Sequence, residues 1–320
     1  MSAQGTLNRT DVLPLAVDRQ LRSSMSIRGQ LKKLGEKSKS HGIRNVLAER
    51  LCRKLGLAVR SFRECEPLFS EKMGLEIGGP SKIFSRGGRF PVYPIAGRLD
   101  NGNFSPRTIW EGSIQEGRTY RYDKDRQPGY QYICEAVDLK SVASESYDFV
   151  LSSHTLEHVA NPLRALREWF RVLKEGGVLV LVVPHKDGTF DHRRPVTPLA
   201  HLIQDHEQGT TEDDLTHLPE ILELHDLAKD PQAGTSEAFK ERSMNNPTNR
   251  CLHHHVFNTE LVVRVLDHLG LWVCAVDPIL PNDIISVSRK LPDGQLPNNG
   301  AFLDNCAGFR ARSPFASDRV

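Results

Sequence analysis

Residues 147–184 read YDFVLSSHTLEHVANPLRALREWFRVLKEGGVLVLVVP and decide the fold class. The stretch begins and ends with near-continuous apolar runs of strand length, 147–153 and 177–184, which are typical of parallel strands covered on both faces. A helix is predicted between them, with a capping asparagine, a proline in the first turn, one apolar face and a terminating glycine. These residues are Asn161, Pro162, Leu163, Leu166, Phe170, Leu173 and Gly176. A strand, a helix and a second strand at this spacing predict a right-handed parallel crossover.

The pattern extends outward into five segments. We predict a mobile basic arm over 1–40, an N-terminal helical segment over 41–71, one α/β domain over 72–290 and a disordered tail over 291–320. The α/β domain is interrupted by a polar helical insertion over 185–250, and it ends in a predicted antiparallel hairpin. The fold class is therefore α/β, a doubly wound Rossmann-like sheet that is mostly parallel. The first sixty residues contain thirteen basic residues against four acidic ones, which suggested either a solvated tail or a docking arm.

Composition excludes several classes of protein. A net charge of +2 over 320 residues argues against nucleic-acid binding through bulk charge. The apolar run 177–184 is far shorter than the roughly 20 residues that span a bilayer. Six cysteines without a CxxC pair and a polar, acid-containing start predict a cytoplasmic protein.

Three predicted strand ends carry polar or small residues, in 75–81 (LEIGGPS), 152–158 (SSHTLEH) and 184–187 (PHKD). Ligands of open parallel sheets bind beyond the carboxyl ends of the strands, near the switch in strand order. We therefore expect the loops that leave Ile77, Ser152 and Pro184 to converge on one ligand.

The strings LEIGGPS, EAVDL (135–139) and YDFVLSSHTLEHV, followed by LKEGGVLVLVVP, resemble the consecutive motifs of class I S-adenosylmethionine-dependent methyltransferases. The resemblance covers roughly residues 72–290. It implies S-adenosylmethionine as the cofactor. One departure is that the second and third glycines of the family's first loop are replaced by Pro80 and Lys82.

The resemblance also implies roles for individual residues. The first loop beside the methionine part of the cofactor would contain Glu76, Gly78, Gly79 and Pro80. The acid that binds the ribose hydroxyls would be Asp100, with Glu111 as the second candidate. The acid near the adenine amino group would be Glu135, with Asp138 as the alternative. Ser152, Ser153 and His154 would flank the cofactor and face the substrate.

An oxygen acceptor needs a base to take its proton, and histidine is suited to this near neutral pH. Twelve of the thirteen histidines lie between His154 and His268. His154 and His185 follow neighbouring predicted strands, and Asp187 shares the loop of His185, so these three are the predicted catalytic residues.

A metal site is the alternative use of the same residues. His154, Glu157 and His158 resemble the metal motif of small-RNA 2′-O-methyltransferases, and His253, His254 or His255 could supply a fourth ligand. Because the LEH string also occurs in methyltransferases without a metal, we predict none.

The predicted function is methyl transfer from S-adenosylmethionine to an oxygen, less favourably a nitrogen, of a small polar acceptor such as a sugar or glycan precursor. Two alternatives stay open: an RNA or protein methyltransferase recruited by the basic arm, and a non-catalytic cofactor-binding scaffold. The sequence does not define an oligomeric state.

Overall fold

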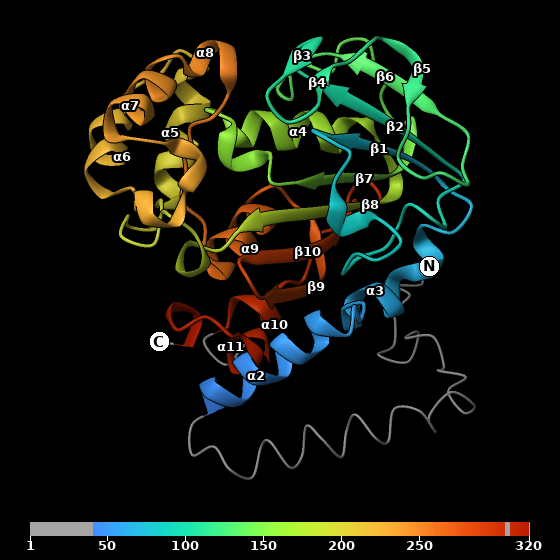
Figure 1. Ribbon diagram of the computed structural model, residues 1–320. Coiled ribbons are helices and arrows are strands. Elements are labelled where there is room, and N and C mark those ends of the chain that lie inside the picture. The colour runs from blue at the N-terminus through green and yellow to red at the C-terminus, as the bar shows by residue number, and fades with distance from the viewer. Residues whose placement is uncertain (1–40, 305–307, 320) are drawn as a thin grey trace.

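The computed structural model describes residues 41–304 and 308–319, and a single large sheet lies at its centre (Figure 1). The strands of this sheet are β1 (Met73–Ile77), β2 (Arg98–Asn103), β5 (Gly117–Tyr120), β6 (Gly129–Ile133), β7 (Tyr147–Ser153), β8 (Leu173–Pro184), β9 (Trp272–Ile279) and β10 (Asp283–Arg289). Two short strands, β3 (Arg107–Thr108) and β4 (Gly112–Ser113), pair separately. The predicted basic arm lies outside the described residues.

The order of the strands in the sheet is β5-β6-β2-β1-β7-β8-β10-β9. The five strands from β6 to β8 are mutually parallel, whereas β10 runs antiparallel to both β8 and β9. This confirms the predicted doubly wound sheet with its C-terminal hairpin. The chain moves outward from β1 to β6 and then returns to β7 on the other side of β1, so the switch in strand order lies between β1 and β7.

The two faces of the sheet are covered by separate apolar layers, as the sequence of β8 predicts. Leu179, Leu181 and Val183 belong to one core cluster, which includes side chains from α4 (Pro162–Val172) and α9 (Thr259–His268). The intervening residues Val178, Val180 and Val182 belong to the other cluster, together with Phe62 of α3 (Arg60–Cys65) and several further aromatic residues. Alternate residues of one strand point to opposite faces, so a run that is apolar at every position needs both layers.

The helices beside the central strands begin where the sequence predicts. Asn161 caps α4, and its Oδ1 accepts a hydrogen bond from the Arg164 amide at 3.0 Å. Asn258 caps α9 in the same way, accepting from the Leu261 amide at 2.9 Å. The end of α4 differs from the prediction, because β8 already begins at Leu173.

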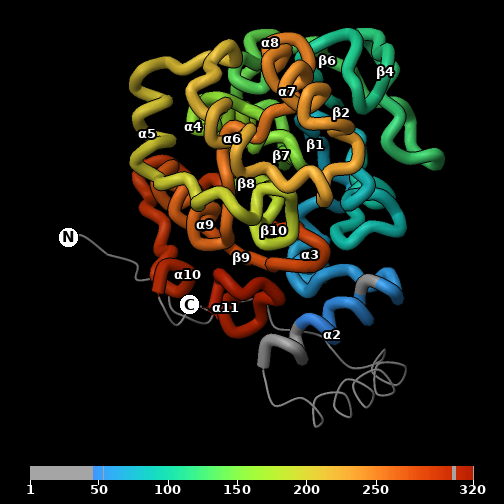
Figure 2. Tube along the Cα trace, turned by 60° about the vertical axis from the view of Figure 1, so that its left-hand side comes forward, coloured from blue at the N-terminus to red at the C-terminus, as the bar shows by residue number. Residues whose placement is uncertain are grey.

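The helical insertion follows β8 and forms a compact group at the carboxyl end of the parallel strands (Figures 1 and 2). Its helices are α5 (Leu199–Gln208), α6 (Leu218–Leu224), α7 (Ser236–Met244) and α8 (Asn246–Asn249). The group has a small core of its own that contains Ile221, Phe239 and Leu252. Short 3-10 turns complete the chain: η1 (Glu66–Leu68), η2 (Lys82–Phe84), η3 (Leu156–His158), η4 (Lys186–Gly188), η5 (Leu227–Lys229), η6 (Pro231–Ala233) and η7 (Ser317–Arg319).

The two ends of the described chain pack near the β9 edge of the sheet (Figure 1). The elements there are α2 (His41–Lys54), α3, α10 (Gly300–Leu303) and α11 (Gly308–Arg312). The prediction of a disordered tail is wrong for its described residues, because Phe309, Ser313, Phe315 and Asp318 are buried. Apolar residues are few and irregularly spaced in this segment, so its sequence shows no helical period. The folded tail nevertheless covers polar groups of the sheet domain. Within the described residues, no helix combines the length and the apolar character needed to cross a bilayer.

Candidate functional site

A cavity of about 650 Å³ lies at the carboxyl ends of the parallel strands. Residues Ile77, Ser153 and Pro184 all line it, which confirms that the loops leaving β1, β7 and β8 converge. The ends of β2 and β6 contribute Asn103 and Cys134. The volume is within the range typical of small-molecule and cofactor sites, and the place is the switch point that the strand order defines.

The first loop lines the cavity at Gly78, where the lack of a side chain lets the loops after β1 and β7 approach each other. Its φ is +82°, and a Cβ at this position would lie 2.3 Å from the Thr155 Oγ1 atom. The Thr155 hydroxyl donates a hydrogen bond to the Ile77 carbonyl at 3.1 Å, which joins the loops after β1 and β7. Pro80 also lines the cavity, whereas Gly79 lies behind it and is held by Asn101. The loop therefore offers bare backbone to a ligand although it lacks the family's later glycines.

Glu76 supports this loop from beneath and does not line the cavity. Its Oε2 accepts hydrogen bonds from the hydroxyls of Tyr93 at 2.7 Å and Tyr120 at 2.5 Å. Burial raises the pKa of the Glu76 carboxyl to about 7, against the lowering effect of hydrogen bonds from Ser81, Tyr120 and Tyr93.

The assignment of Asp100 to the ribose hydroxyls needs correction. Asp100 lies in the middle of β2, fully buried, and its carboxylate binds Arg98, the Tyr147 hydroxyl and the Tyr130 amide. The side chain that reaches the cavity from the end of β2 is Asn103. Glu111, the second candidate, does line the cavity, as the ribose-binding hypothesis requires.

Glu135 lines the cavity at the end of β6, where an arginine of the insertion meets it. Arg250 Nη2 donates to Glu135 Oε1 at 2.7 Å, and its guanidinium lies 5.3 Å from the centre of the Phe104 ring. Glu212 Oε2 lies 3.4 Å from Arg250 Nη1. Burial, more than the opposing effect of Arg250, raises the pKa of Glu212 to about 7. The sequence identified Glu135 but gave no signal for Arg250. The alternative acid, Asp138, pairs with Lys140 outside this cavity.

The loop after β7 carries two of the three residues predicted to face the cavity. Ser153 and His154 line it, whereas the Ser152 side chain is buried in the sheet. His154 Nε2 lies 2.8 Å from Asp283 Oδ1 and its Nδ1 lies 3.5 Å from Glu157 Oε1. Burial lowers the pKa of His154, but these two carboxylates outweigh it and raise the pKa to about 10. His154 is thus a cation near neutral pH and is unsuited to take a proton.

The other two predicted catalytic residues face the C-terminal tail instead of the cavity. His185 is fully buried, stacks on Phe315 at a centroid distance of 3.9 Å, and its Nε2 lies 3.1 Å from Asp318 Oδ1. The Asp187 carboxylate accepts two hydrogen bonds from Ser317 at 3.0 Å. The prediction failed because residues after a strand end can turn either towards the ligand or towards a neighbouring segment.

A group of ionisable side chains that the sequence combined only as alternative metal ligands lines the cavity. Ligand atoms of Glu157, His158 and His253 lie within 4.8 Å of one another, and all three residues line the cavity. The Glu157 carboxylate has no hydrogen-bond partner in the described part of the chain. Burial, together with His253, lowers the pKa of His158 to about 4, so this imidazole is neutral near pH 7.

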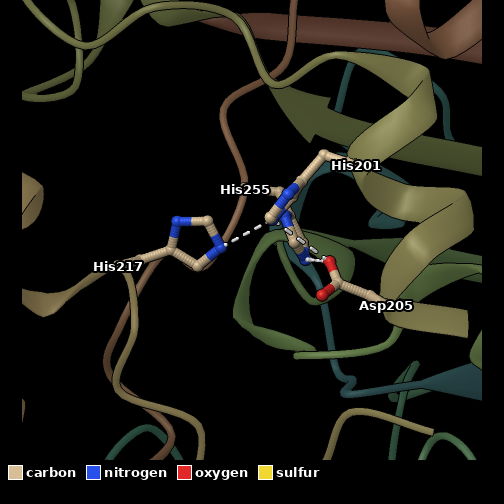
Figure 3. Close-up of side chains that lie close together, drawn as sticks. All are labelled: His201, Asp205, His217 and His255. Carbon is tan, nitrogen blue, oxygen red and sulfur yellow. Dashed lines mark hydrogen bonds and ion pairs between the residues drawn. The ribbon is translucent and has the colours of Figure 1, made fainter. Parts of the chain in front are cut away.

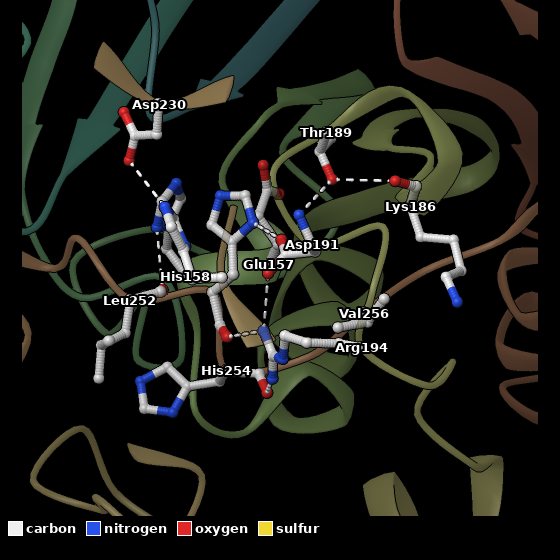
Figure 4. A network of polar contacts seen from close by, with 12 residues as sticks. Glu157, His158, Lys186, Thr189, Asp191, Arg194, Asp230, Leu252, His254 and Val256 are labelled. Carbon is white, nitrogen blue, oxygen red and sulfur yellow. Dashed lines mark hydrogen bonds and ion pairs between the residues drawn. The ribbon is translucent and has the colours of Figure 1, made fainter. Parts of the chain in front are cut away.

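His253 is oriented by a buried carboxylate. Its Nδ1 lies 2.6 Å from Asp191 Oδ2, and Asp191 Oδ1 in turn binds Arg194 Nη1 at 3.0 Å. Arg194 is itself buried and donates to the His253 and His254 carbonyls, so the network fixes both the ring and its backbone (Figure 4). Burial raises the pKa of Asp191, but His253 and Arg194 outweigh it and lower the pKa to about 2. Asp191 is therefore an ionised acceptor that holds a proton on Nδ1 of His253 and leaves Nε2 of the ring outside this contact.

The comparisons with known proteins agree with this architecture. The profile of a methyltransferase-domain family matches residues 109–181. The chain contains a class I S-adenosylmethionine-dependent methyltransferase domain. This confirms the family predicted from the sequence and S-adenosylmethionine as the cofactor of the domain.

Among curated proteins, the chain is similar to a ubiquinone biosynthesis O-methyltransferase of Parvibaculum lavamentivorans, with 24% identity over 137 residues. The match covers 43% of this chain and 48% of that protein, so the chain spans about half the length of its curated relative. An S-adenosylmethionine-dependent methyltransferase from Aquifex aeolicus aligns with 82% of this chain and 98% of its own, at 13% identity and a TM-score of 0.37. A methyltransferase from Methanosarcina mazei aligns with 71% and 97%, at 18% identity and a TM-score of 0.41.

The residues at the carboxyl ends of β1, β2 and β6 fit the cofactor. Gly78 lines the cavity with bare backbone, and Asn103, Glu111 and Glu135 add polar side chains to the same cavity. A nucleoside with an amino-acid tail needs such a mixture of bare backbone and polar side chains. Glu157, His158 and His253 line the same cavity and are candidates for contact with a methyl acceptor.

Proposed function

We propose that the protein transfers a methyl group from S-adenosylmethionine to a hydroxyl oxygen of a small polar acceptor, with His253 as the general base. The observation that carries this proposal is the Asp191–His253 pair, whose histidine lines the same cavity as the cofactor loop. A base is required for an oxygen acceptor because the hydroxyl proton must leave as the new bond forms.

The cofactor supplies an electrophilic methyl group on a sulfonium. The barrier to its transfer is lowered mainly by alignment of donor and acceptor. Asp191 holds His253 in the tautomer that carries its proton on Nδ1, so Nε2 can accept the acceptor's proton. Oε2 of Glu157 has no hydrogen-bond partner among the described residues and can accept a hydrogen bond from a further hydroxyl of the acceptor. The cationic His154 neutralises the charge of Glu157 from the other side.

The acceptor side of the cavity suits a hydroxylated ring. Trp110 lines the cavity, its side chain is half exposed, and its ring lies 5.6 Å from that of His158. An exposed indole beside a group of hydrogen-bonding side chains is a surface on which a sugar or a phenol can stack. The curated relative is named as an O-methyltransferase, which supports oxygen over nitrogen as the methylated atom.

The test is a methyl-label transfer screen with the full chain, using labelled S-adenosylmethionine and pools of sugars, phenols and RNA. With the acceptor found, His253→Gln should lower kcat by about 10²- to 10⁴-fold and leave cofactor binding unchanged. His192→Gln is the matched control, because His192 also pairs with an aspartate, Asp226, at 2.9 Å but does not line the cavity. Equal activity of the His253 variant and the wild type would reject the base. If calorimetry detects no binding of S-adenosylmethionine, the proposed transfer is rejected; binding without transfer to any pool would indicate a non-catalytic cofactor-binding scaffold.

A further inference from the structure

Four metal-ligating side chains meet at a point away from the cavity. His201 and Asp205 lie one turn apart on α5, His217 immediately precedes α6, and His255 lies in the segment before α9. The side chains of His201, Asp205 and His217 approach that of His255 from different directions (Figure 3). None of the four lines the cavity that holds the proposed reaction.

The separations within this cluster are those of ligands around one ion. The two Nε2 atoms of His201 and His217 are 3.0 Å apart, and Asp205 Oδ2 lies 3.4 Å from His201 Nε2 and 3.6 Å from His255 Nε2. All four ligand atoms lie within 4.8 Å of one another. Ligands about 2.0 to 2.1 Å from a tetrahedral zinc ion are separated by roughly 3.4 Å, so a small inward or outward adjustment suffices.

The surroundings leave one carboxylate oxygen for the ion. Asp205 Oδ1 accepts a hydrogen bond from the Thr210 hydroxyl at 3.1 Å, whereas Oδ2 has no hydrogen-bond partner among the described residues. Asp205 and His255 are buried, and His201 and His217 are half-buried. A second hydrogen bond that fixes a ligating carboxylate is a common feature of metal sites.

We propose that His201, Asp205, His217 and His255 bind one Zn²⁺ ion. Three imidazoles and one carboxylate are ligands that suit zinc, and four protein ligands with half-buried access form a closed, structural site. The ion connects α5, the loop before α6 and the segment before α9, and thereby ties the helical insertion to the methyltransferase domain. The proposal does not depend on the reaction assigned to the cavity.

The competing interpretation is a cluster held by hydrogen bonds alone. His201 and His217 could share one proton between their Nε2 atoms, and His255 Nε2 lies 3.2 Å from the Ala160 carbonyl. A second place for a metal is the Glu157, His158 and His253 group in the cavity. The experiment must separate these from the proposed site.

The test measures zinc in the purified full chain by mass spectrometry after dialysis against a chelator-free buffer, and then follows thermal unfolding of chelator-stripped protein as Zn²⁺ is added. Wild-type protein should retain one Zn²⁺ per chain, and saturating Zn²⁺ should raise Tm by about 5 °C or more. His217→Ala, a change at a half-buried loop residue, should weaken binding by at least about 100-fold and abolish the response of Tm. His206→Ala, on the same helix beside Asp205 but outside the cluster, is the matched control and should behave as wild type.

A His158→Ala variant distinguishes the two candidate places. Loss of zinc in this variant with retention in His217→Ala would assign the ion to the cavity and overturn the proposal. Wild-type protein that neither retains zinc nor changes its Tm when Zn²⁺ is added would show a hydrogen-bonded histidine cluster only, which also overturns it. Because the Tm titration uses wild-type protein, it shows whether zinc binds even if His217→Ala fails to fold, and retention of zinc by His158→Ala then excludes the cavity as its place.

Discussion

Replacing the carboxylate that orients His253 should destabilise the protein by an amount that depends on pH. In Asp191→Asn, one amide oxygen and one NH₂ group replace two acceptor oxygens, so either His253 or Arg194 faces a donor instead of an acceptor. The side chain of Asp191 is only 4% exposed, so solvent screens the lost interactions weakly. The decrease of its pKa from 3.8 to about 2 corresponds to about 2.5 kcal/mol of stability near pH 7.

The sign of the pH dependence follows from the lowered pKa. The contribution of Asp191 is complete above its unfolded pKa of 3.8 and is lost as the pH falls through about 2. Urea unfolding of wild type and Asp191→Asn near pH 7 should therefore differ by about 2 to 3 kcal/mol, and the difference should shrink as the pH falls below about 4.

The control for this measurement is Asp125→Asn, which breaks an exposed ion pair with Arg86 and should leave stability nearly unchanged. If Asp191→Asn were as stable as wild type throughout this range, the carboxylate would not be the partner of His253 and Arg194. A loss of stability that persisted unchanged at low pH would also contradict the argument, because it would point to packing and not to charge.

Three further predictions concern other parts of the molecule. Gly78→Ala should weaken S-adenosylmethionine binding by about tenfold or more in calorimetry, because the new Cβ would meet Thr155 and a positive φ disfavours alanine. The control Gly87→Ala should bind the cofactor normally, because a Cβ at that position would meet no other atom. Because the pKa of His154 is raised to about 10, its protonated form stabilises the fold. This contribution is complete below about pH 6.5 and is lost as the pH rises through about 10, so His154→Ala should reduce the fall in Tm over this interval. Phe315→Ala should lower the free energy of unfolding in urea by about 3 kcal/mol, since the ring is buried against the sheet domain.

The sequence was informative about the central strands for a simple reason. A strand covered on both faces must be apolar at nearly every position, and residues 147–153 and 177–184 satisfy this without any knowledge of their neighbours. The capping asparagines at 161 and 258 act within one helical turn, so they too are readable from local sequence. The convergence of three strand ends on one cavity followed from topology.

The site residues were only partly predictable, because a strand end does not specify which way each side chain turns. Gly78, Glu135, Ser153 and His154 line the cavity as expected. Asp100 stands too early in its strand to reach the cavity.

The sequence by itself determined the fold, the family and the edge of the sheet where a ligand binds, since these depend on local periodicity and on the rules of strand connection. Only the tertiary structure decided which histidines share a site. In the folded chain, His253 pairs with Asp191, and His185 is buried against the C-terminal tail. His201, His217 and His255, which are separated by 16 and 38 positions in the chain, lie in one cluster. Contacts over such separations depend on how the insertion folds back on the sheet, and no short stretch of sequence encodes that arrangement.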